Sequence, residues 1–250
     1  MIRFIAFLLI CALPAHAEEE IVLGLSQDQV AITATFEGSD ILVFGAVKRE
    51  TPIPDKSELG VIVTIAGPDQ PVDIWRKDRR VGIWINTDEV EVDAAPSFYA
   101  VATSAPMRDV LHHVEDLQYR ITTPRTIKAI GGQVSDSVAF MNALIRIRTD
   151  EGLYQRLEGA IDLEEDTLFR TAITLPANLT EGTYEARIFL TRNGRVIDEY
   201  RTEIPVRKVG LERWLYNLAH NYALLYGLMS LAIAVGAGWG ASAIFGMLRR

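Results

Sequence analysis

The residue types that most often carry chemistry are few in this chain, and their spacing argues against a catalytic or metal site. His112 and His113, followed by Glu115 and Asp116, form the one local cluster of metal-ligand residue types. Adjacent side chains on a helix point about 100° apart, so the two histidines cannot easily reach one ion. No serine stands in a nucleophile-elbow pattern and no glycine-rich phosphate loop occurs. The sequence therefore predicts a non-enzymatic protein without metal or cofactor.

A second group of charged residues is a compact patch of cations flanked by two tryptophans, Trp75 and Trp84. The patch consists of Arg76, Lys77, Arg79 and Arg80. Because short apolar runs lie on both sides, we expect it at the tip of a hairpin. Such a patch could bind an anion, an anionic lipid headgroup or an acidic partner surface, or it could be an ordinary exposed turn. The residues alone leave these alternatives open.

The first 17 residues are typical of a signal peptide. Arg3 precedes an apolar run of about ten residues, half of what a spanning helix needs, and Ala15-His16-Ala17 supplies small residues for cleavage. Cys11, the single cysteine, lies inside this run. The mature chain is thus expected to lack disulfides and thiolate ligands. It would carry 24 basic and 33 acidic residues, a formal charge of −9 that disfavours nucleic acid as a partner.

The opposite end of the chain predicts a transmembrane helix over residues 222–248. No Asp, Glu, Lys or Arg occurs from Trp214 to Leu248. At 1.5 Å per residue this stretch crosses a hydrocarbon core of about 30 Å. Tyrosines and a tryptophan in residues 209–221 and just beyond are typical of the headgroup layer. A two-residue tail, 249–250, follows the span.

The signal peptide sets the expected orientation, because it commits the following domain to export. Arg249 and Arg250 would then lie in the cytoplasm. Basic residues on the exported flank, Arg207, Lys208 and Arg213, outnumber this pair. A long domain translocates largely regardless of its flanking charge. We therefore expect a single-pass inner-membrane protein with a large periplasmic domain and a cytoplasmic C-terminus.

Small residues form two rows along the predicted span, at every fourth position. The first row is Ser230, Ala234, Gly238, Ser242 and Gly246, and the second is Ala232, Gly236 and Gly240. Small side chains let two helix backbones approach closely in lipid, so the rows predict packing against another membrane helix. The alternative is that Gly and Ala are simply common in membrane spans.

The exported part is predicted to be mainly β, with immunoglobulin-like sandwich sections over residues 18–105 and 153–208. Apolar and β-branched runs recur at short intervals in both sections. The predicted strands are 21–25, 30–36, 41–47, 60–66, 72–75, 81–85, 98–103, 167–175, 183–190 and 195–206. Asn193-Gly194 predicts a type I′ hairpin turn, and Tyr184 is placed to brace a corner of the sandwich.

A helical segment over residues 106–152 separates the two β sections. Apolar spacing predicts one helix from Met107 to Ile121, capped by Ser104, and a second from Asp136 to about Glu151, capped by Ser135. Gly131-Gly132 lies between them. The helices need a surface on which to pack.

Several short stretches resemble a family of uncharacterised alphaproteobacterial transmembrane proteins of about 250 residues, with a signal peptide and one C-terminal span. These stretches are Phe44-Gly45-Ala46, Gly82-Ile83-Trp84, Pro96-Ser97-Phe98-Tyr99, Leu168-Phe169-Arg170, residues 176–184 and Leu225-Tyr226-Gly227. The resemblance covers nearly the whole chain. It implies no catalytic motif, and it suggests an integral-membrane partner such as a sulfite-exporter-type permease, by analogy alone.

The sequence is compatible with three functions. The first is a membrane-anchored periplasmic accessory protein that assists a transporter or envelope complex. The second is a freestanding periplasmic ligand-binding module that uses the span as a tether. The third is an envelope enzyme whose site is assembled from scattered residues.

Overall fold

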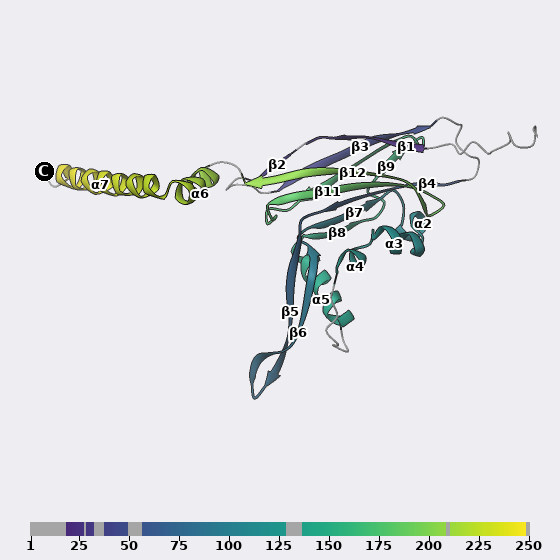
Figure 1. Cartoon of the computed structure of the whole chain (residues 1–250), viewed down its shortest axis with the longest axis horizontal. Helices are drawn as coiled ribbons and strands as arrows, with labels where there is room; N and C mark the ends of the chain where they lie inside the picture. The colour runs from purple at the N-terminus through teal and green to yellow at the C-terminus, as the bar shows by residue number, and fades with distance from the viewer. Residues whose placement is uncertain are drawn as a thin grey trace, which may run out of the picture.

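A computed structural model of the chain describes residues 19–27, 29–32, 38–49, 57–128, 137–208 and 211–248. The predicted signal peptide, with Cys11, and the terminal Arg249 and Arg250 lie outside these residues. Strands dominate the described part, which confirms the predicted mainly β class. They form a two-layered sandwich from which one long hairpin projects, and two helices follow the last strand (Figure 1).

One layer is an antiparallel sheet of four strands. Its order is β1 (Glu19–Leu25), β3 (Ser39–Arg49), β10 (Leu168–Leu175) and β9 (Asp162–Glu164). Burial alternates strictly along β10, where Phe169, Ile173 and Leu175 point inward and the residues between are exposed. One face of this sheet therefore covers the core while the other faces solvent.

The other layer has six strands. Its order is β2 (Val30–Ile32), β12 (Arg195–Lys208), β11 (Gly182–Arg192), β4 (Leu59–Ala66), β7 (Tyr99–Thr103) and β8 (Tyr154–Leu157). The pairs β2–β12 and β7–β8 are parallel. Seven of the eight residues of β4 are buried, as expected for a central strand covered on both faces.

The two predicted β sections share one sandwich. β3 pairs with β10 in the first sheet and β4 pairs with β11 in the second, so strands from 18–105 and 153–208 lie side by side in both layers. The buried apolar residues of both sheets belong to one core. Neither section can bury its apolar face without the other.

The last hairpin has the predicted geometry. Asn193 and Gly194 form a two-residue turn with φ of 48° and 76°, both positive as a type I′ turn requires. The hydroxyl of buried Tyr184 donates to the carbonyl oxygen of Thr180 at 2.9 Å, which braces the approach to β11. Of the predicted strand 30–36, β2 covers Val30–Ile32, and residues 33–36 lie outside the described part.

The predicted continuous helix from Met107 to Ile121 is wrong. The structure has three short helices instead, α2 (Met107–Val110), α3 (His113–Tyr119) and α4 (Thr123–Thr126). The His112 amide donates to Gly194 O at 2.8 Å, outside any helix, and Arg120 ends α3 in a left-handed conformation. Ser104 does not cap α2, because its hydroxyl accepts from the Val61 amide. Anchoring to the sandwich overrides the helical pattern.

The second predicted helix is confirmed as α5 (Ser137–Asp150), which buries Phe140 and Leu144. Its predicted first residues, Ser135 and Asp136, and Gly131-Gly132 lie outside the described part. The crossover from β7 through α2–α5 to β8 makes that strand pair parallel.

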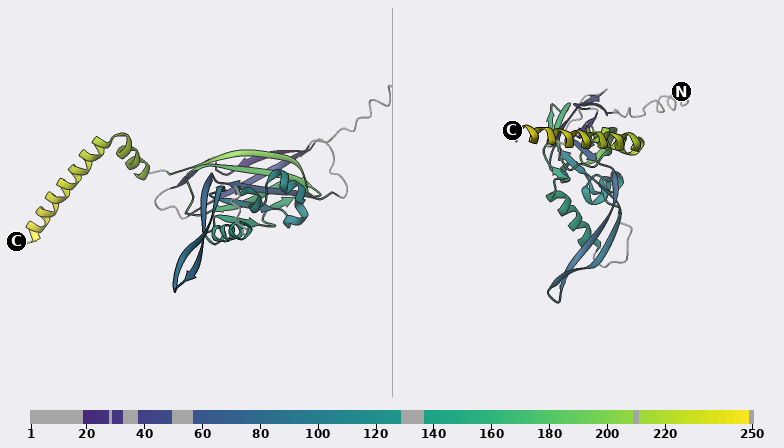
Figure 2. Two further views of the ribbon diagram at one scale, coloured as in Figure 1. Left: turned by 60° about the horizontal axis from the view of Figure 1, so that its bottom comes forward. Right: turned by 90° about the vertical axis from the view of Figure 1, so that its left-hand side faces the viewer.

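Residues 69–96 form a hairpin that we call the arm. It consists of β5 (Asp69–Arg80) and β6 (Ile83–Pro96), much longer than the two short strands predicted there. Val81 and Gly82 make the turn, so the predicted strand 81–85 begins at Ile83 instead. Figure 2 shows the arm projecting away from both layers of the sandwich.

Two helices follow β12. α6 (Leu211–Asn221) is short, and α7 (Ala223–Leu248) spans 26 residues, in agreement with the predicted span 222–248. Tyr222 lies between them, although its amide still donates to Leu218 O at 3.1 Å.

Candidate functional site

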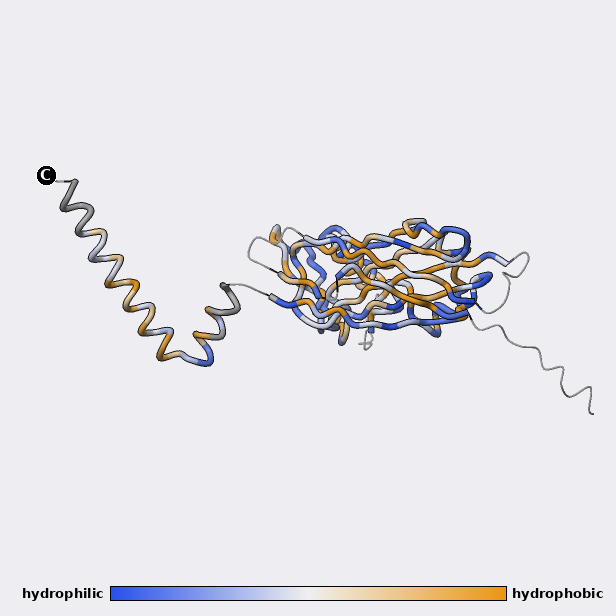
Figure 3. The backbone as a smooth tube through the Cα atoms, turned by 90° about the horizontal axis from the view of Figure 1, so that it is seen from above, coloured by the Kyte–Doolittle hydropathy of each residue, from blue (hydrophilic) through white to orange (hydrophobic). Residues whose placement is uncertain are grey.

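The first candidate site is α7. Its segment Ala223–Ser242 has a mean hydropathy of 1.6 and is long and apolar enough to cross a membrane, and none of it is buried inside the protein. Leu231, Ile233 and Val235 are each more than 60% exposed. Figure 3 shows hydrophobic residues along α7, with α6 at its beginning and no other described element beside it. Among the residues that the structure describes, nothing covers these side chains, whereas a bilayer would.

Both rows of small residues lie on α7 as predicted. At about 100° per residue, the row through Ser230, Ala234, Gly238 and Ser242 faces roughly opposite to the row through Ala232, Gly236 and Gly240. A Cβ added at Gly236, Gly238 or Gly240 would meet no atom within 4 Å beyond the helix's own backbone. Gly246 belongs to α7, but its surroundings lie outside the described part. Both faces are sterically open to a second helix.

Aromatic residues gather where α6 meets α7. The ring of Tyr216 stacks on His220 at 4.0 Å, and His220 Nδ1 lies 3.0 Å from Tyr216 O. Tyr222 and Tyr226 follow in the next turns and are exposed. Amphipathic rings of this kind favour the headgroup layer, so this junction suits the boundary between water and lipid.

The second candidate site is the predicted cation patch, which lies on the last five residues of β5, next to the arm's turn as expected. Arg76 is engaged, since its guanidinium lies 4.6 Å from the Phe140 ring and 3.9 Å from Asp88. Arg80 pairs with Asp78 at 3.5 Å. Lys77 and Arg79 are exposed, and no ion pair is found for either among the described residues. Trp84 is directly opposite Arg79 in the arm's register.

A third candidate, missed from the sequence, is a groove of about 450 Å³ on the solvent face of the four-stranded sheet. Val22, Phe44 and Leu168 form its apolar floor and are each 44–53% exposed. Arg170 lies at its rim, 3.3 Å from Asp162 and 3.6 Å from Glu164. An apolar floor with a few charged groups at the edge fits a ligand that has both an apolar and a charged part.

Two strand glycines shape this groove. Gly24 is opposite Phe44, and a Cβ there would come within 2.4 Å of the Phe44 ring. A Cβ at Gly45 would meet Phe169 at 2.5 Å and the backbone oxygen of Val22 at 2.7 Å. Glycine inside a strand marks a place where other groups approach closely. Gly45, inside the predicted strand 41–47, indicates such a close approach from the sequence alone, but the sequence does not identify the approaching residues.

A buried ion cluster holds β1, the edge strand of the groove. Glu19 lies 2.8 Å from Arg49 and 2.5 Å from Arg192, and its side chain is 9% exposed. Burial raises the pKa of Glu19, but hydrogen bonds from Arg192 and Arg49 outweigh this, and its pKa is lowered below 4.5. The Ile21 amide also donates to Asp198 Oδ2 at 2.9 Å. These contacts tie β1 to both sheets.

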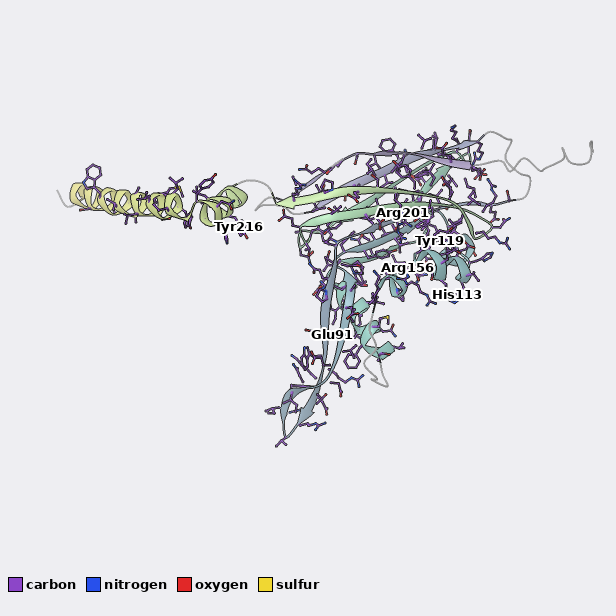
Figure 4. All side chains as sticks on the ribbon, in the orientation of Figure 1. Glu91, His113, Tyr119, Arg156, Arg201 and Tyr216 are labelled. Carbon is purple, nitrogen blue, oxygen red and sulfur yellow. The ribbon has the colours of Figure 1, made fainter. Side chains whose placement is uncertain are left out.

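The two histidines lie at the N-terminus of α3. His112 precedes α3 and His113 begins it, while Asp116 is buried and accepts hydrogen bonds from the Ile121 and Thr122 amides at 3.1 and 2.7 Å. Figure 4 shows His113 on the outside of the helical segment. Within the residues that the structure describes, no group of three His, Cys, Asp or Glu side chains could hold a metal ion.

A family model described as "Putative transmembrane protein (Alph_Pro_TM)" matches residues 20–247, which is nearly the whole chain and includes the sandwich, the arm and α7. No curated protein matches the chain.

Proposed function

We propose that this chain, which belongs to the Alph_Pro_TM family of transmembrane proteins, is an accessory protein of the inner membrane. In this proposal the β sandwich lies in the periplasm, where it binds a component of the envelope. α7 crosses the membrane and packs against a membrane-embedded partner, so that the sandwich is held beside it.

The proposal is supported by the exposure of α7, whose side chains are not covered by any other described part of the chain. A span that served as a tether alone would need apolar residues but no regular rows of small ones. The row through Gly238 extends from Ser230 to Ser242, and among the described residues no atom outside the helix lies within 4 Å of a Cβ added at Gly238. Close backbone approach by a partner helix would fill that space and bring packing and weak hydrogen bonds.

The chemistry of the partner follows from the same helix. α7 offers small, uncharged residues and two hydroxyls, Ser230 and Ser242, so the partner presents a helix of similar character inside the membrane. A multi-span transporter provides many such helices. The family resemblance suggests, by analogy alone, that a sulfite-exporter-type permease is the first partner to test.

Co-purification of the full-length tagged protein from membranes in mild detergent tests this proposal. Replacing Gly238 and Ser242 by Leu should reduce the recovered partner by roughly tenfold or more, because the backbones can no longer approach closely. Replacing Gly236 and Gly240 by Leu, on the opposite face, is the matched control and should retain the partner. Undiminished recovery with the Gly238 and Ser242 variant would contradict the proposal.

A second candidate function is a freestanding binding module, and the groove over Val22, Phe44 and Leu168 favours it. In that case residues 18–208 attached to an unrelated single-span anchor should fully restore the wild-type phenotype to a strain in which the gene is deleted. The accessory function instead predicts that this chimera fails, since the native α7 is missing.

A further inference from the structure

The arm is divided into a supported root and a free tip. Near the root, Ile74, Val90 and Val92 are buried, and Phe140 of α5 packs below Arg76. Lys128 pairs with Ala94 through two backbone hydrogen bonds of 2.8 and 3.2 Å. Beyond Arg76 the side chains become exposed, and Figure 4 shows them extending past Glu91 with no other element beside them.

The tip exposes large apolar side chains, which is unusual for a hairpin end in water. Val81 is fully exposed, Trp84 is 67% exposed and Ile83 is 65% exposed. Val81 also has a φ of 50°, a left-handed conformation that is unfavourable for a β-branched residue and natural for Asn or Gly. Neither solubility nor turn geometry explains a valine at this position. Burial in an apolar environment outside the chain would explain it.

Charge is distributed unevenly along the arm. The patch of four cations lies beside the tip, with Asp78 as the acidic residue among them. Toward the root, β6 carries Asp88, Glu89, Glu91 and Asp93. A negatively charged surface would therefore attract the tip and repel the root, so that the arm meets such a surface end-on.

One face of the tip combines cations with indole rings. Alternation along β5 puts Trp75, Lys77 and Arg79 on the same face, and register adds Trp84 from β6. Indole rings favour the headgroup layer of a bilayer, and cations beside them interact with anionic headgroups. This combination matches a lipid surface better than it matches a small anion, which needs a concave site.

The root of the arm lies near the point where the chain leaves for the membrane. Pro68, just before β5, lies against Gly182, which pairs with Val206 two residues before β12 ends. Figures 1 and 2 agree that the arm and α6 leave from the same end of the sandwich. Twelve extended residues reach roughly 40 Å, and in Figure 1 the arm points across the direction of α7. Contact between the tip and the bilayer that contains α7 therefore requires the sandwich to lie over the membrane surface with the arm turned toward it.

We propose that the arm is a second membrane contact, whose Trp84 and Val81 tip enters the headgroup layer while Lys77 and Arg79 bind anionic phospholipids of the bilayer that α7 spans. Two contacts at one end of the sandwich would fix its orientation above the membrane. The proposal rests on α7 spanning the membrane and does not depend on the partner of α7.

The test places an environment-sensitive NBD dye at the tip of the full-length protein in nanodiscs, which keep one protein with one bilayer. Ile83→Cys carries the dye, and Ile197→Cys on β12, an exposed residue of the same type, is the control. Cys11→Ser removes the other cysteine in both. Discs contain phosphatidylcholine alone or phosphatidylcholine with about one third phosphatidylglycerol, a fraction chosen to give a strongly negative surface.

Dye emission at position 83 should rise roughly threefold and shift to the blue in the anionic discs, because the dye leaves water for the interface. Position 197 should not respond. The double variant K77E/R79E should lower the docked fraction by roughly tenfold or more. Val81→Asn, which suits the turn better, should keep the arm folded and still weaken the response.

Equal emission at position 83 in both kinds of disc would overturn the proposal, and so would an undiminished response of K77E/R79E. A response that needs an added acidic protein would also overturn it. A failure of α7 to span is distinguishable, since such a protein would not co-elute with the discs.

Discussion

The apolar residues of the sandwich and those of α7 differ in burial. In the sandwich, Phe189, Ile62 and Ile173 are completely buried by the chain's own strands. In α7, Leu231, Ile233 and Trp239 are 62–77% exposed, and no other part of the described chain buries them. The first region carries its own apolar environment, whereas the second requires one from outside.

The sandwich therefore determines the stability of the folded chain, whereas α7 determines its location. Burial of apolar surface within the sandwich drives its folding. The same property in α7 can drive only insertion into lipid or association with another helix. Substitutions of equal size should therefore have unequal consequences in the two regions.

The largest effect is expected for Phe189→Ala. Its ring is fully buried and packs edge-on against Tyr119 at 5.8 Å. Removing it should lower the free energy of unfolding of the sandwich by about 3–5 kcal/mol, measured by urea unfolding in detergent. Leu231→Ala on α7 is the matched control and should leave that transition unchanged. Equal losses would mean that α7 packs on the sandwich.

Glycine substitutions should also have different effects in the sandwich and in α7. Ala at position 45 must displace the buried Phe169 and the backbone of Val22, so Gly45→Ala should destabilise the sandwich by about 1–3 kcal/mol. Gly236→Ala meets nothing and should leave the melting temperature of the sandwich unchanged while raising the helicity of α7. Circular dichroism of both variants checks this. A destabilising Gly236→Ala would show that α7 is covered.

An effect of similar size is expected for Glu19→Gln, but this one depends on pH. The pKa of Glu19 is lowered in the folded state, so its contribution to stability is present above the ordinary value of 4.5 and is lost as pH falls through the folded pKa. The variant should be about 2 kcal/mol less stable at pH 7 and should converge on the parent in acid. Urea midpoints from pH 7 to pH 3 measure the difference. A constant difference would contradict the assigned ion cluster.

The sequence predicted the regular elements well where a local pattern decides them. The final hairpin follows from Asn193-Gly194, whose positive φ angles few other residue pairs adopt readily. α7 follows from a long uncharged run. In both cases the property that sets the structure belongs to consecutive residues.

Prediction failed where distant parts of the chain decide. The helix expected over Met107–Ile121 breaks because His112 bonds to Gly194, which is 82 positions away in the sequence. The groove needs β1, β3, β9 and β10 side by side, and no local pattern encodes that order. The length of the arm was missed partly because its outer half, residues 76–88, is largely exposed and lacks the alternation that identifies a half-buried strand. Near the root, residues 89–93 do alternate, but this short pattern was not recognised as part of a strand.

The placement of α7 in a membrane is the claim on which the rest depends, and alkaline extraction combined with a topology reporter tests it most directly. After carbonate treatment the full-length protein should stay in the membrane pellet, and a reporter fused after Arg250 should be active in the cytoplasm alone. Release into the supernatant, or reporter activity in the periplasm, would contradict the account.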